Sequence, residues 1–585
     1  MIKKLLKNVG EYKLPSILAP LFVTCEVILE VFMPFLMSVI IDRGVTAGNI
    51  NVIRQTGIIL IIITLFSLMF GALSGSSAAK ASAGFAKNLR RSMFYKVQNF
   101  SFENIDKFST SSIVTRLTTD VTNLQNAYQM IIRIAVRSPA MLLFSLIMAL
   151  GVNKKLSLIF LCIIPVIATG LFVIIKKSHK IFEWIFKTYD RLNTVVQENL
   201  RGIRVVKSFV REQHEKKKFT DVSTSIYNKF KMAERIMSFN APLMQFSVYT
   251  CILLISWFGA KIIVTTGSTE LTTGQLTSLI SYTSQILMSL MMISMIFVMV
   301  TMAKASAERI VEILDEESLL SNPEKPVYEV SDGSISFENV SFGYNKNMCL
   351  KNINLAISSG ETIGIIGGTG SAKTSLIQLI PRLYDVKEGK VLVGGKDVRE
   401  YDIETLRNEV AVVLQKNVLF SGTIKENLKW GNKDATDEEI IRVCRLAQAD
   451  EFVQNFPKKY DTYIEQGGSN VSGGQKQRLC IARALLKKPK ILILDDSTSA
   501  VDTRTDALIK KAFAEEIPNT TKLIIAQRIS SVQDADKIII MEKGEINDIG
   551  THEELLNRNE IYQEIYYSQQ KGGKEDGSER QNAQG

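Results

Sequence analysis

The sequence predicts a chain of two parts, an α-helical membrane domain with six spans followed by a soluble α/β domain. Long uncharged runs fill the chain up to about residue 304, whereas charged residues are dispersed throughout the part after about residue 315. A length of 585 residues has room for both parts. We therefore expect a membrane domain at 1–314, a linker at 315–330, the α/β domain at 331–570 and a disordered tail at 571–585.

Six segments are apolar enough to cross a hydrocarbon core of ~30 Å, which takes ~20 residues of helix. They lie near residues 14–41, 55–79, 133–153, 156–175, 236–261 and 273–303. The basic start, MIKKLLK, predicts a short interfacial helix and not a signal peptide. The apolar run after it is too long for a signal peptide and has no cleavage site of small residues.

Lysine and arginine are concentrated in two long polar stretches, between the second and third predicted spans and between the fourth and fifth. Cytoplasmic loops of membrane proteins carry such an excess, so both stretches are expected inside the cell. The other connections are short and are expected outside, although Lys154 and Lys155 run against the rule. This topology predicts a multi-pass protein of the cell membrane with both termini and the α/β domain in the cytoplasm.

Composition narrows the classes of partner. The net charge is +11, and much of the basic excess flanks the apolar runs, which favours anionic lipid head groups over nucleic acid. The six cysteines are isolated and form no C-x-x-C pair, so neither a zinc site nor a disulfide framework is predicted.

Two carboxylates, Glu26 and Glu30, lie one helical turn apart deep in the first predicted span. A charge facing lipid there would cost ~2.5–3.5 kcal/mol or more, so both should face protein or a water-filled cavity. One interpretation is a substrate cavity that favours cationic or polar compounds. The other is a pair of protonated or hydrogen-bonded structural carboxylates.

The stretch ETIGIIGGTGSAKTSLIQLI predicts a strand, a glycine-rich loop and a helix. Its core GGTGSAKT matches the phosphate-binding pattern G-x-x-x-x-G-K-[ST], except that Ala372 replaces the last glycine. This change costs little if the residue is already helical. In such a loop backbone N–H groups surround nucleotide phosphates, Lys373 reaches the β and γ oxygens, and Thr374 is a ligand of magnesium. The predicted nucleotide-binding residues here are Gly367, Gly368, Thr369, Gly370, Ser371, Ala372, Lys373, Thr374 and Ser375.

Two further stretches support a nucleotide site. The aliphatic run ILILDD ends in Asp495, at the place where this type of fold has its second magnesium carboxylate. Upstream, VSGGQ begins a predicted helix with a serine and two glycines, which makes a second phosphate-binding element. Its distance along the chain from the first loop suggests that it serves another nucleotide.

In combination these motifs resemble the ATP-binding cassette (ABC) exporter family. GGTGSAKT, the glutamine of VVLQKNVLFSGTIKENL, VSGGQ, ILILDD and SAVD occur in the order and spacing of that family, over residues 1 to about 570. The resemblance implies a half-transporter, six spans fused to one nucleotide-binding domain, with ATP and Mg²⁺ as cofactors. The stretches 103–121 and around 208–219 resemble the two cytoplasmic loops that carry coupling helices.

The resemblance also implies roles for single residues. Tyr344 would stack on adenine, Gln415 would bind magnesium and sense the membrane loops, and Asp502 would couple two nucleotide sites. The VSGGQ residues would clasp the γ-phosphate of ATP bound to the opposite subunit; they are Ser472, Gly473, Gly474 and Gln475.

This chain departs from the family pattern at two catalytic positions. The family has a glutamate after the magnesium aspartate and a histidine in a following strand, and here these positions are Asp496 and Gln527. Aspartate is one methylene shorter, and a displacement of ~1 Å can cost a hundredfold in rate. Glutamine cannot carry the positive charge that a phosphoryl-transfer transition state benefits from. A softer departure is IEQGGSN before VSGGQ, where the family more often has glycine followed by glutamate.

The sequence therefore predicts one half of a heterodimeric exporter of drugs or lipid-like amphiphiles. Its own phosphate loop would bind ATP but hydrolyse it poorly, and its VSGGQ would complete a competent site on a partner with the intact glutamate and histidine. The likeness is to heterodimeric bacterial multidrug exporters, with hydrophobic or cationic small molecules as substrates. One alternative is a homodimeric lipid or drug flippase with both sites active. Another is a regulatory or channel-like membrane protein gated by ATP, whereas a soluble ATPase acting on DNA is excluded by the six spans.

Overall fold

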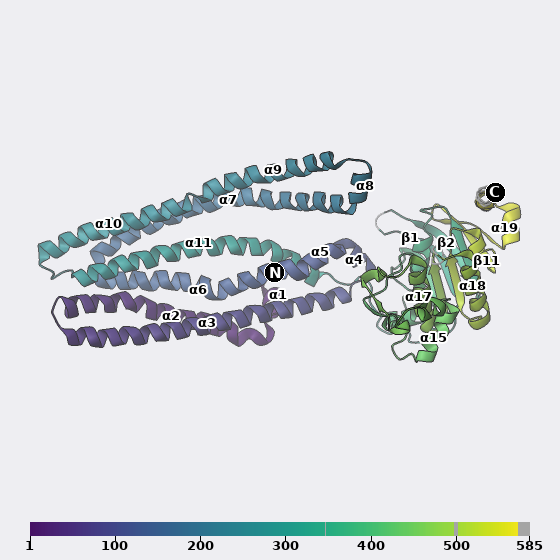
Figure 1. Cartoon of the computed structure of the whole chain (residues 1–585), viewed down its shortest axis with the longest axis horizontal. Helices are drawn as coiled ribbons and strands as arrows, with labels where there is room; N and C mark the ends of the chain where they lie inside the picture. Colours follow the sequence, from purple (N-terminus) through teal and green to yellow (C-terminus); the bar gives the residue numbers. More distant parts are fainter. Residues whose placement is uncertain (345–346, 497–500, 571–585) are drawn as a thin grey trace. The chain divides into compact units, whose positions relative to one another are not determined.

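The computed structural model describes residues 1–570 except 345–346 and 497–500 (Figure 1). The predicted disordered tail, and Ser499 and Ala500 of the SAVD motif, lie outside the described residues. The chain divides into two compact units. The first contains residues 1–98 and 109–316, and the second contains Asn99–Phe108 and the chain from Glu317 onward. The domain boundary predicted at residue 314 does not anticipate that residues 99–108 belong to the second unit.

The first unit is a bundle of long helices. Six of its helical segments are long and apolar enough to cross a membrane, so the predicted number of spans is confirmed. The long helices are α2 (Lys13–Val39), α3 (Ile50–Gln98), α6 (Val121–Val152), α7 (Lys154–Arg201), α9 (Glu212–Met237), α10 (Asn240–Thr266) and α11 (Thr273–Asp315). The shorter elements are α1 (Ile2–Lys7), η1 (Gly10–Tyr12), η2 (Ile40–Val45), α5 (Thr110–Thr115), η3 (Arg116–Asp120) and α8 (Ile203–Ser208), while α4 (Phe102–Phe108) belongs to the second unit.

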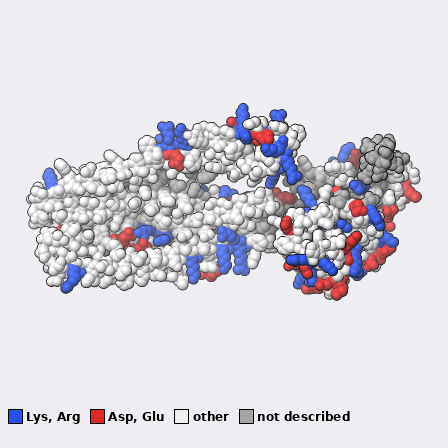
Figure 2. Space-filling model, in the orientation of Figure 1, with Lys and Arg blue, Asp and Glu red and all other residues white. Residues whose placement is uncertain are grey.

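The polar stretches between the spans are mostly helical as well. Helix α3 continues to Gln98, and α7 continues to Arg201 before α9 runs back beside it (Figure 1). Residues 176–201 contain neither glycine nor proline, so nothing in the sequence breaks α7 where its apolar span ends. The spans therefore extend well beyond their apolar segments, and Figure 2 shows how little of the visible face of this bundle is charged.

The described part of the second unit contains two main sheets. An antiparallel sheet has the order β2-β1-β4-β5, formed by β1 (Ile335–Phe342), β2 (Leu350–Ile357), β4 (Glu388–Val393) and β5 (Lys396–Asp397). The larger sheet has the order β12-β11-β3-β10-β9-β6. Its strands are β3 (Thr362–Gly367), β6 (Val410–Val413), β9 (Ile491–Asp495), β10 (Thr521–Ile525), β11 (Lys537–Glu542) and β12 (Glu545–Gly550). Strands β7 (Gly422–Thr423) and β8 (Tyr463–Ile464) pair separately.

Helices complete the second unit and cover its larger sheet. They are α12 (Lys373–Gln378), α13 (Ile403–Glu409), α14 (Ile424–Leu428), α15 (Asp437–Leu446), α16 (Asp450–Gln454), α17 (Gly473–Leu486), α18 (Thr503–Glu516) and α19 (His552–Arg558), with three short turns η4 (Lys459–Asp461), η5 (Gln466–Gly468) and η6 (Ile529–Ser531). Every residue of β9 and β10 is buried, as expected for central parallel strands with both faces covered.

Candidate functional site

The candidate site lies where four neighbouring parallel strands end. In the larger sheet β6, β9, β10 and β3 are adjacent and parallel. Parallel strands have their carboxyl ends at one edge of the sheet, which is the usual ligand edge of α/β folds. This edge brings together the phosphate loop after β3, the aspartates at the end of β9, and the glutamines that follow β6 and β10.

The phosphate loop is held by its lysine. The Lys373 ammonium donates to the carbonyl oxygens of Gly367 and Gly368, both at 2.9 Å, and to the Ser371 hydroxyl at 3.3 Å. Burial lowers the pKa of Lys373, while the carboxylates of Asp495 and Asp496 act in the opposite direction. A half-buried ammonium held by neutral carbonyl groups is suited to exchange those partners for phosphate oxygens.

Ala372 has a left-handed backbone, with φ +68° and ψ 23°, immediately before α12. The condition under which replacing the family glycine would cost little, a helical backbone at this residue, is therefore not met. A left-handed conformation places the Cβ too close to the next carbonyl oxygen and costs ~1–2 kcal/mol. The phosphate loop of this chain is thus strained at the position where the pattern has glycine.

Replacing Ala372 by glycine should stabilise the second unit by ~1 kcal/mol, because glycine adopts this conformation without a Cβ clash. Thermal unfolding of the purified protein in detergent measures the change. The matched control is Ala482→Gly in the interior of α17, which should destabilise by ~1 kcal/mol. A loss of stability in both variants would show that Ala372 is not strained.

Two predicted magnesium ligands lie together. The Thr374 hydroxyl donates to the Asp495 carboxylate, at 3.0 Å from Oδ2 and 3.3 Å from Oδ1. Burial raises the pKa of Asp495, and the negative charge of the neighbouring Asp496 raises it further. The hydrogen bond from Thr374 and the positive charge of Lys373 act in the opposite direction. A hydroxyl and a buried carboxylate are the oxygen ligands that Mg²⁺ prefers, so this pair fits the ion.

The two unusual residues contact each other. The Gln527 amide donates to Asp496 Oδ2 at 2.8 Å, and the Gln415 amide donates to the same oxygen at 3.3 Å. The Asp496 backbone is left-handed, with φ +48°. Its N–H donates a hydrogen bond to the Ile525 carbonyl, and the Gln477 amide donates one to the Asp496 carbonyl. Neighbouring groups thus hold both the backbone and the side chain of Asp496.

The remaining predicted nucleotide residues lie at three other places. The Tyr344 hydroxyl contacts the Ser375 hydroxyl at 3.0 Å and donates to Gln378 Oε1 at 2.9 Å, and the residue is 41% exposed. Asp502 caps α18 by accepting from the Thr505 N–H at 3.0 Å. The VSGGQ residues form the start of α17 as a reciprocal cap between Ser472 and Gln475, with Gly473 and Gly474 as its first two helical residues.

Glu26 and Glu30 of α2 share one partner in α6. The Arg137 guanidinium contacts Glu26 Oε1 and donates to Glu30 Oε2 at 2.6 Å. The other oxygen of Glu26 is buried, without a hydrogen-bond partner in the described part of the chain, and lies against Gly71 of α3. These contacts favour the structural interpretation of the pair, and contact with substrate stays a prediction.

Sequence reasoning missed Arg137, although a signal for it was present. This arginine lies inside the third predicted span. An unpaired charge there costs as much free energy as an unpaired charge in the first predicted span. Acidic residues in one predicted span and an arginine in another therefore pointed to an ion pair.

Comparison with known proteins decides the family. Residues 16–290 match the ABC transporter transmembrane region, and residues 350–499 match the ABC transporter domain family. The chain is 38% identical over 573 residues to the uncharacterized ABC transporter ATP-binding protein YfiB of Bacillus subtilis, covering 97% of this chain and 98% of that protein. The chain belongs to the ABC transporter family.

Other ABC proteins match along the whole chain. The ATP-dependent lipid A-core flippase of Desulfotalea psychrophila is 30% identical, over 97% of this chain and 99% of that protein. A solved structure of a bacterial Atm1-family ABC exporter with ATP bound shares the fold with a TM-score of 0.81 at 22% identity, covering 95% of this chain and 98% of that one. The chain thus joins one ABC transporter transmembrane region to one ABC domain and has the fold of that exporter. Its ABC domain implies an ATPase coupled to transport.

Proposed function

We propose that this ABC half-transporter is the subunit with the weak catalytic site in a heterodimeric exporter. The observation that supports this most is the contact set of Asp496, whose carboxylate accepts from the amides of Gln527 and Gln415. A general base has to be within hydrogen-bond reach of the attacking water, and a carboxylate already held by two amides on a short side chain is poorly placed for that. ATP would bind at Lys373 and Thr374, and hydrolysis would occur mainly at the site that Ser472 completes with the partner.

The residues of this site divide the work of nucleotide binding. Lys373 would exchange its loop carbonyl partners for phosphate oxygens, and Thr374 with Asp495 and Gln415 would hold magnesium. A magnesium ion held by these residues would supply positive charge to offset the negative charge of the phosphate groups. Gln527 can donate a hydrogen bond to a phosphate oxygen but adds no positive charge, so its contribution to the transition state is smaller than that of a histidine.

The proposed substrates are drugs or lipid-like amphiphiles exported across the cell membrane. One relative of this chain is named as a lipid A-core flippase, which supports a lipid-like cargo. The excess of lysine and arginine in the polar stretches supports a cytoplasmic location for both termini and the ABC domain. Closure of two ABC domains on ATP would then bias the membrane helices toward an outward-facing state.

The contacts of Glu26 and Glu30 allow a test of their role. Replacing Arg137 by leucine leaves two carboxylates without a counter-charge inside the bundle. Removing one partner of a buried ion pair destabilises by ~3–5 kcal/mol, and the partial exposure of these side chains places the effect near the lower value. Thermal unfolding in detergent should show this loss.

Adding Glu26→Gln and Glu30→Gln to the Arg137→Leu variant should recover most of the lost stability, since no charge then remains unpaired. If the triple variant stays as unstable as Arg137→Leu, the three residues do not act as a structural unit. Efflux of a cationic dye by the triple variant separates the two interpretations, because only a substrate-cavity role predicts that efflux falls while stability is kept.

The alternative is a homodimeric lipid or drug flippase in which Asp496 and Gln527 are working residues. It predicts substantial ATP hydrolysis by the chain purified alone in lipid nanodiscs, whereas the heterodimer proposal predicts little. A channel-like protein gated by ATP would instead show nucleotide-dependent conductance without uphill transport.

A further inference from the structure

Tyr384 lies at the centre of an aromatic cluster that joins three segments of the second unit. Its ring centroid is 5.1 Å from that of Tyr344, 5.6 Å from that of Phe342 and 6.1 Å from that of Phe102. The Tyr344 and Tyr384 rings are nearly perpendicular, at 86°, an arrangement that aromatic pairs favour. Tyr344 is the predicted adenine-stacking residue, and Phe102 belongs to α4.

The hydroxyl of Tyr384 connects this cluster to α4 by a hydrogen bond. It donates to Asp106 Oδ2 at 2.9 Å, and Tyr384 itself is only 8% exposed. Burial raises the pKa of Tyr384, and the Asp106 carboxylate raises it further, so the phenol keeps its proton and remains a donor. A hydrogen bond to a charged acceptor in a partly dry site is one of the stronger kinds.

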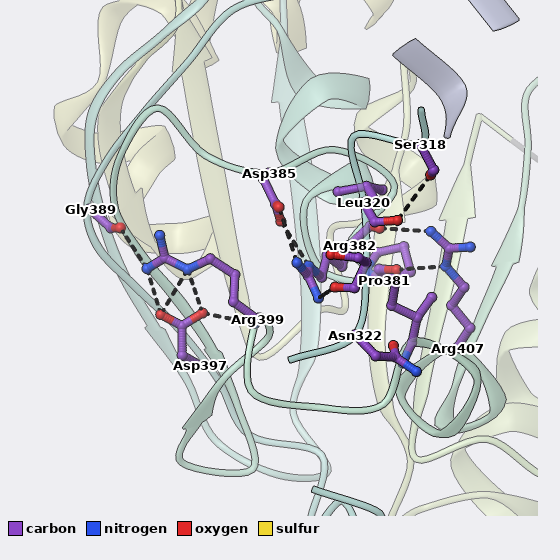
Figure 3. Close-up of polar contacts among 12 residues, drawn as sticks. Ser318, Leu320, Asn322, Pro381, Arg382, Asp385, Gly389, Asp397, Arg399 and Arg407 are labelled. Atoms are coloured by element: carbon purple, nitrogen blue, oxygen red, sulfur yellow. Dashed lines mark hydrogen bonds and ion pairs between the residues drawn. The ribbon is translucent and has the colours of Figure 1, made fainter. Parts of the chain in front are cut away.

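The segment that carries Tyr384 is held firmly by two arginines (Figure 3). Arg407 donates to the carbonyl oxygens of Pro381, at 3.2 Å, and Arg382, at 2.8 Å. Arg382 in turn makes two hydrogen bonds to Asp385, at 2.8 Å and 3.1 Å. Residues 381–385 follow directly on α12, which carries Lys373 and Thr374, so Tyr384 is fixed relative to the phosphate loop.

Helix α4 has a second attachment in the same unit. The Asn104 side chain donates to the Glu317 carbonyl at 3.0 Å and accepts from the Leu319 N–H at 3.4 Å. Arg382 donates to the Ser321 carbonyl of the same linker at 3.3 Å. These hydrogen bonds hold the linker beside α4. Tyr384 contacts both α4 and Tyr344.

We propose that Tyr384 is a positioning residue that transmits nucleotide occupancy beside Tyr344 to helix α4 through its ring and its hydroxyl. This rests on the proposed function, in which ATP stacks on Tyr344. A base that orders the Tyr344 ring orders the ring packed against it, and the Tyr384 hydroxyl then holds Asp106 in one position. The consequence is that ATP binding reduces the motion of α4.

Hydrogen exchange of residues 102–108, measured by mass spectrometry with and without Mg-ATP, tests this proposal. The complex is purified from its native membrane in mild detergent, and binding of a fluorescent ATP analogue is measured on the same samples. In the parent protein ATP should slow exchange in α4. In Tyr384→Phe the ring stays and the hydroxyl is lost, so the slowing should shrink by about tenfold, the factor expected for one hydrogen bond to a charged acceptor, with analogue affinity unchanged within about twofold.

The matched control is Tyr401→Phe. Tyr401 is another buried tyrosine of this unit, and its hydroxyl donates to the Val393 carbonyl at 2.7 Å, away from α4. This variant should keep the full ATP effect on α4, and Asp106→Asn should weaken it less than Tyr384→Phe because an amide oxygen still accepts. An unchanged ATP effect in Tyr384→Phe, or an equal loss in Tyr401→Phe, overturns the proposal. Failure of the parent complex to bind the analogue would instead overturn the proposed function.

Discussion

Replacing Asp496 by glutamate together with Gln527 by histidine is expected to raise ATP turnover at this chain's own phosphate loop by about a hundredfold. The longer side chain moves the carboxylate by about 1 Å, a displacement that can be worth ~10² in rate when a group has to align a nucleophile. Replacing Gln527 also removes the amide that now contacts Asp496 at 2.8 Å and supplies a group that can carry positive charge. Steady-state ATP hydrolysis by the purified complex gives the rate.

The measurement requires that the site at the partner's phosphate loop hydrolyse no ATP. We therefore place the double substitution in a Ser472→Arg background, where the partner's phosphate loop lacks a working VSGGQ. Asp496→Asn with Gln527→His is the matched control, because it has the histidine but no carboxylate, and it should show no increase. The weak-site account fails if the parent background already hydrolyses ATP rapidly and Asp496→Ala abolishes that activity.

The second large effect is an unequal response to two single substitutions in the complex. Ser472→Arg should lower total turnover at least a hundredfold, since it blocks the competent site, and loss of one stabilising donor alone can cost ~10²–10³. Lys373→Ala should lower turnover only a few fold, because this chain's own loop contributes little hydrolysis. Ser472 caps the start of α17 and Lys373 begins α12, so both residues lie outside the strands of the larger sheet.

The same pair of substitutions separates the two oligomeric proposals. In a homodimer every site uses one Lys373 and one Ser472, so both variants would lose turnover to the same extent. Ser469→Arg is a control for bulk near the motif, since Ser469 precedes VSGGQ and its hydroxyl donates to Glu465. Equal losses in Ser472→Arg and Lys373→Ala would contradict the asymmetric account.

Much of the fold could be predicted because its signals are local. The six apolar segments fix the spans by length alone, and the aliphatic run of β9 with its terminal aspartate predicts a buried parallel strand. The extension of α3 and α7 through the polar stretches was not predicted, since charge patterning indicates where a segment lies and not whether it is helical. The grouping of Asn99–Phe108 with the second unit depends on contacts such as Asp106 with Tyr384, which sequence order does not reveal.

The candidate site was predictable in its parts but not in its strain or its pairing. The motifs identify Lys373, Thr374 and Asp495 because phosphate and magnesium binding require those residue types at that spacing. The left-handed backbone of Ala372 is a property of the folded loop. The contact between Asp496 and Gln527 arises because β9 and β10 are neighbours in the sheet although they are separated along the chain.

The central claim is that this chain works with a different half-transporter. Native mass spectrometry of the tagged chain, purified from its native membrane in mild detergent, tests it most directly. The account predicts a one-to-one complex with a second ABC half-transporter that has glutamate and histidine at the positions of Asp496 and Gln527. Recovery of a dimer of this chain alone would contradict it.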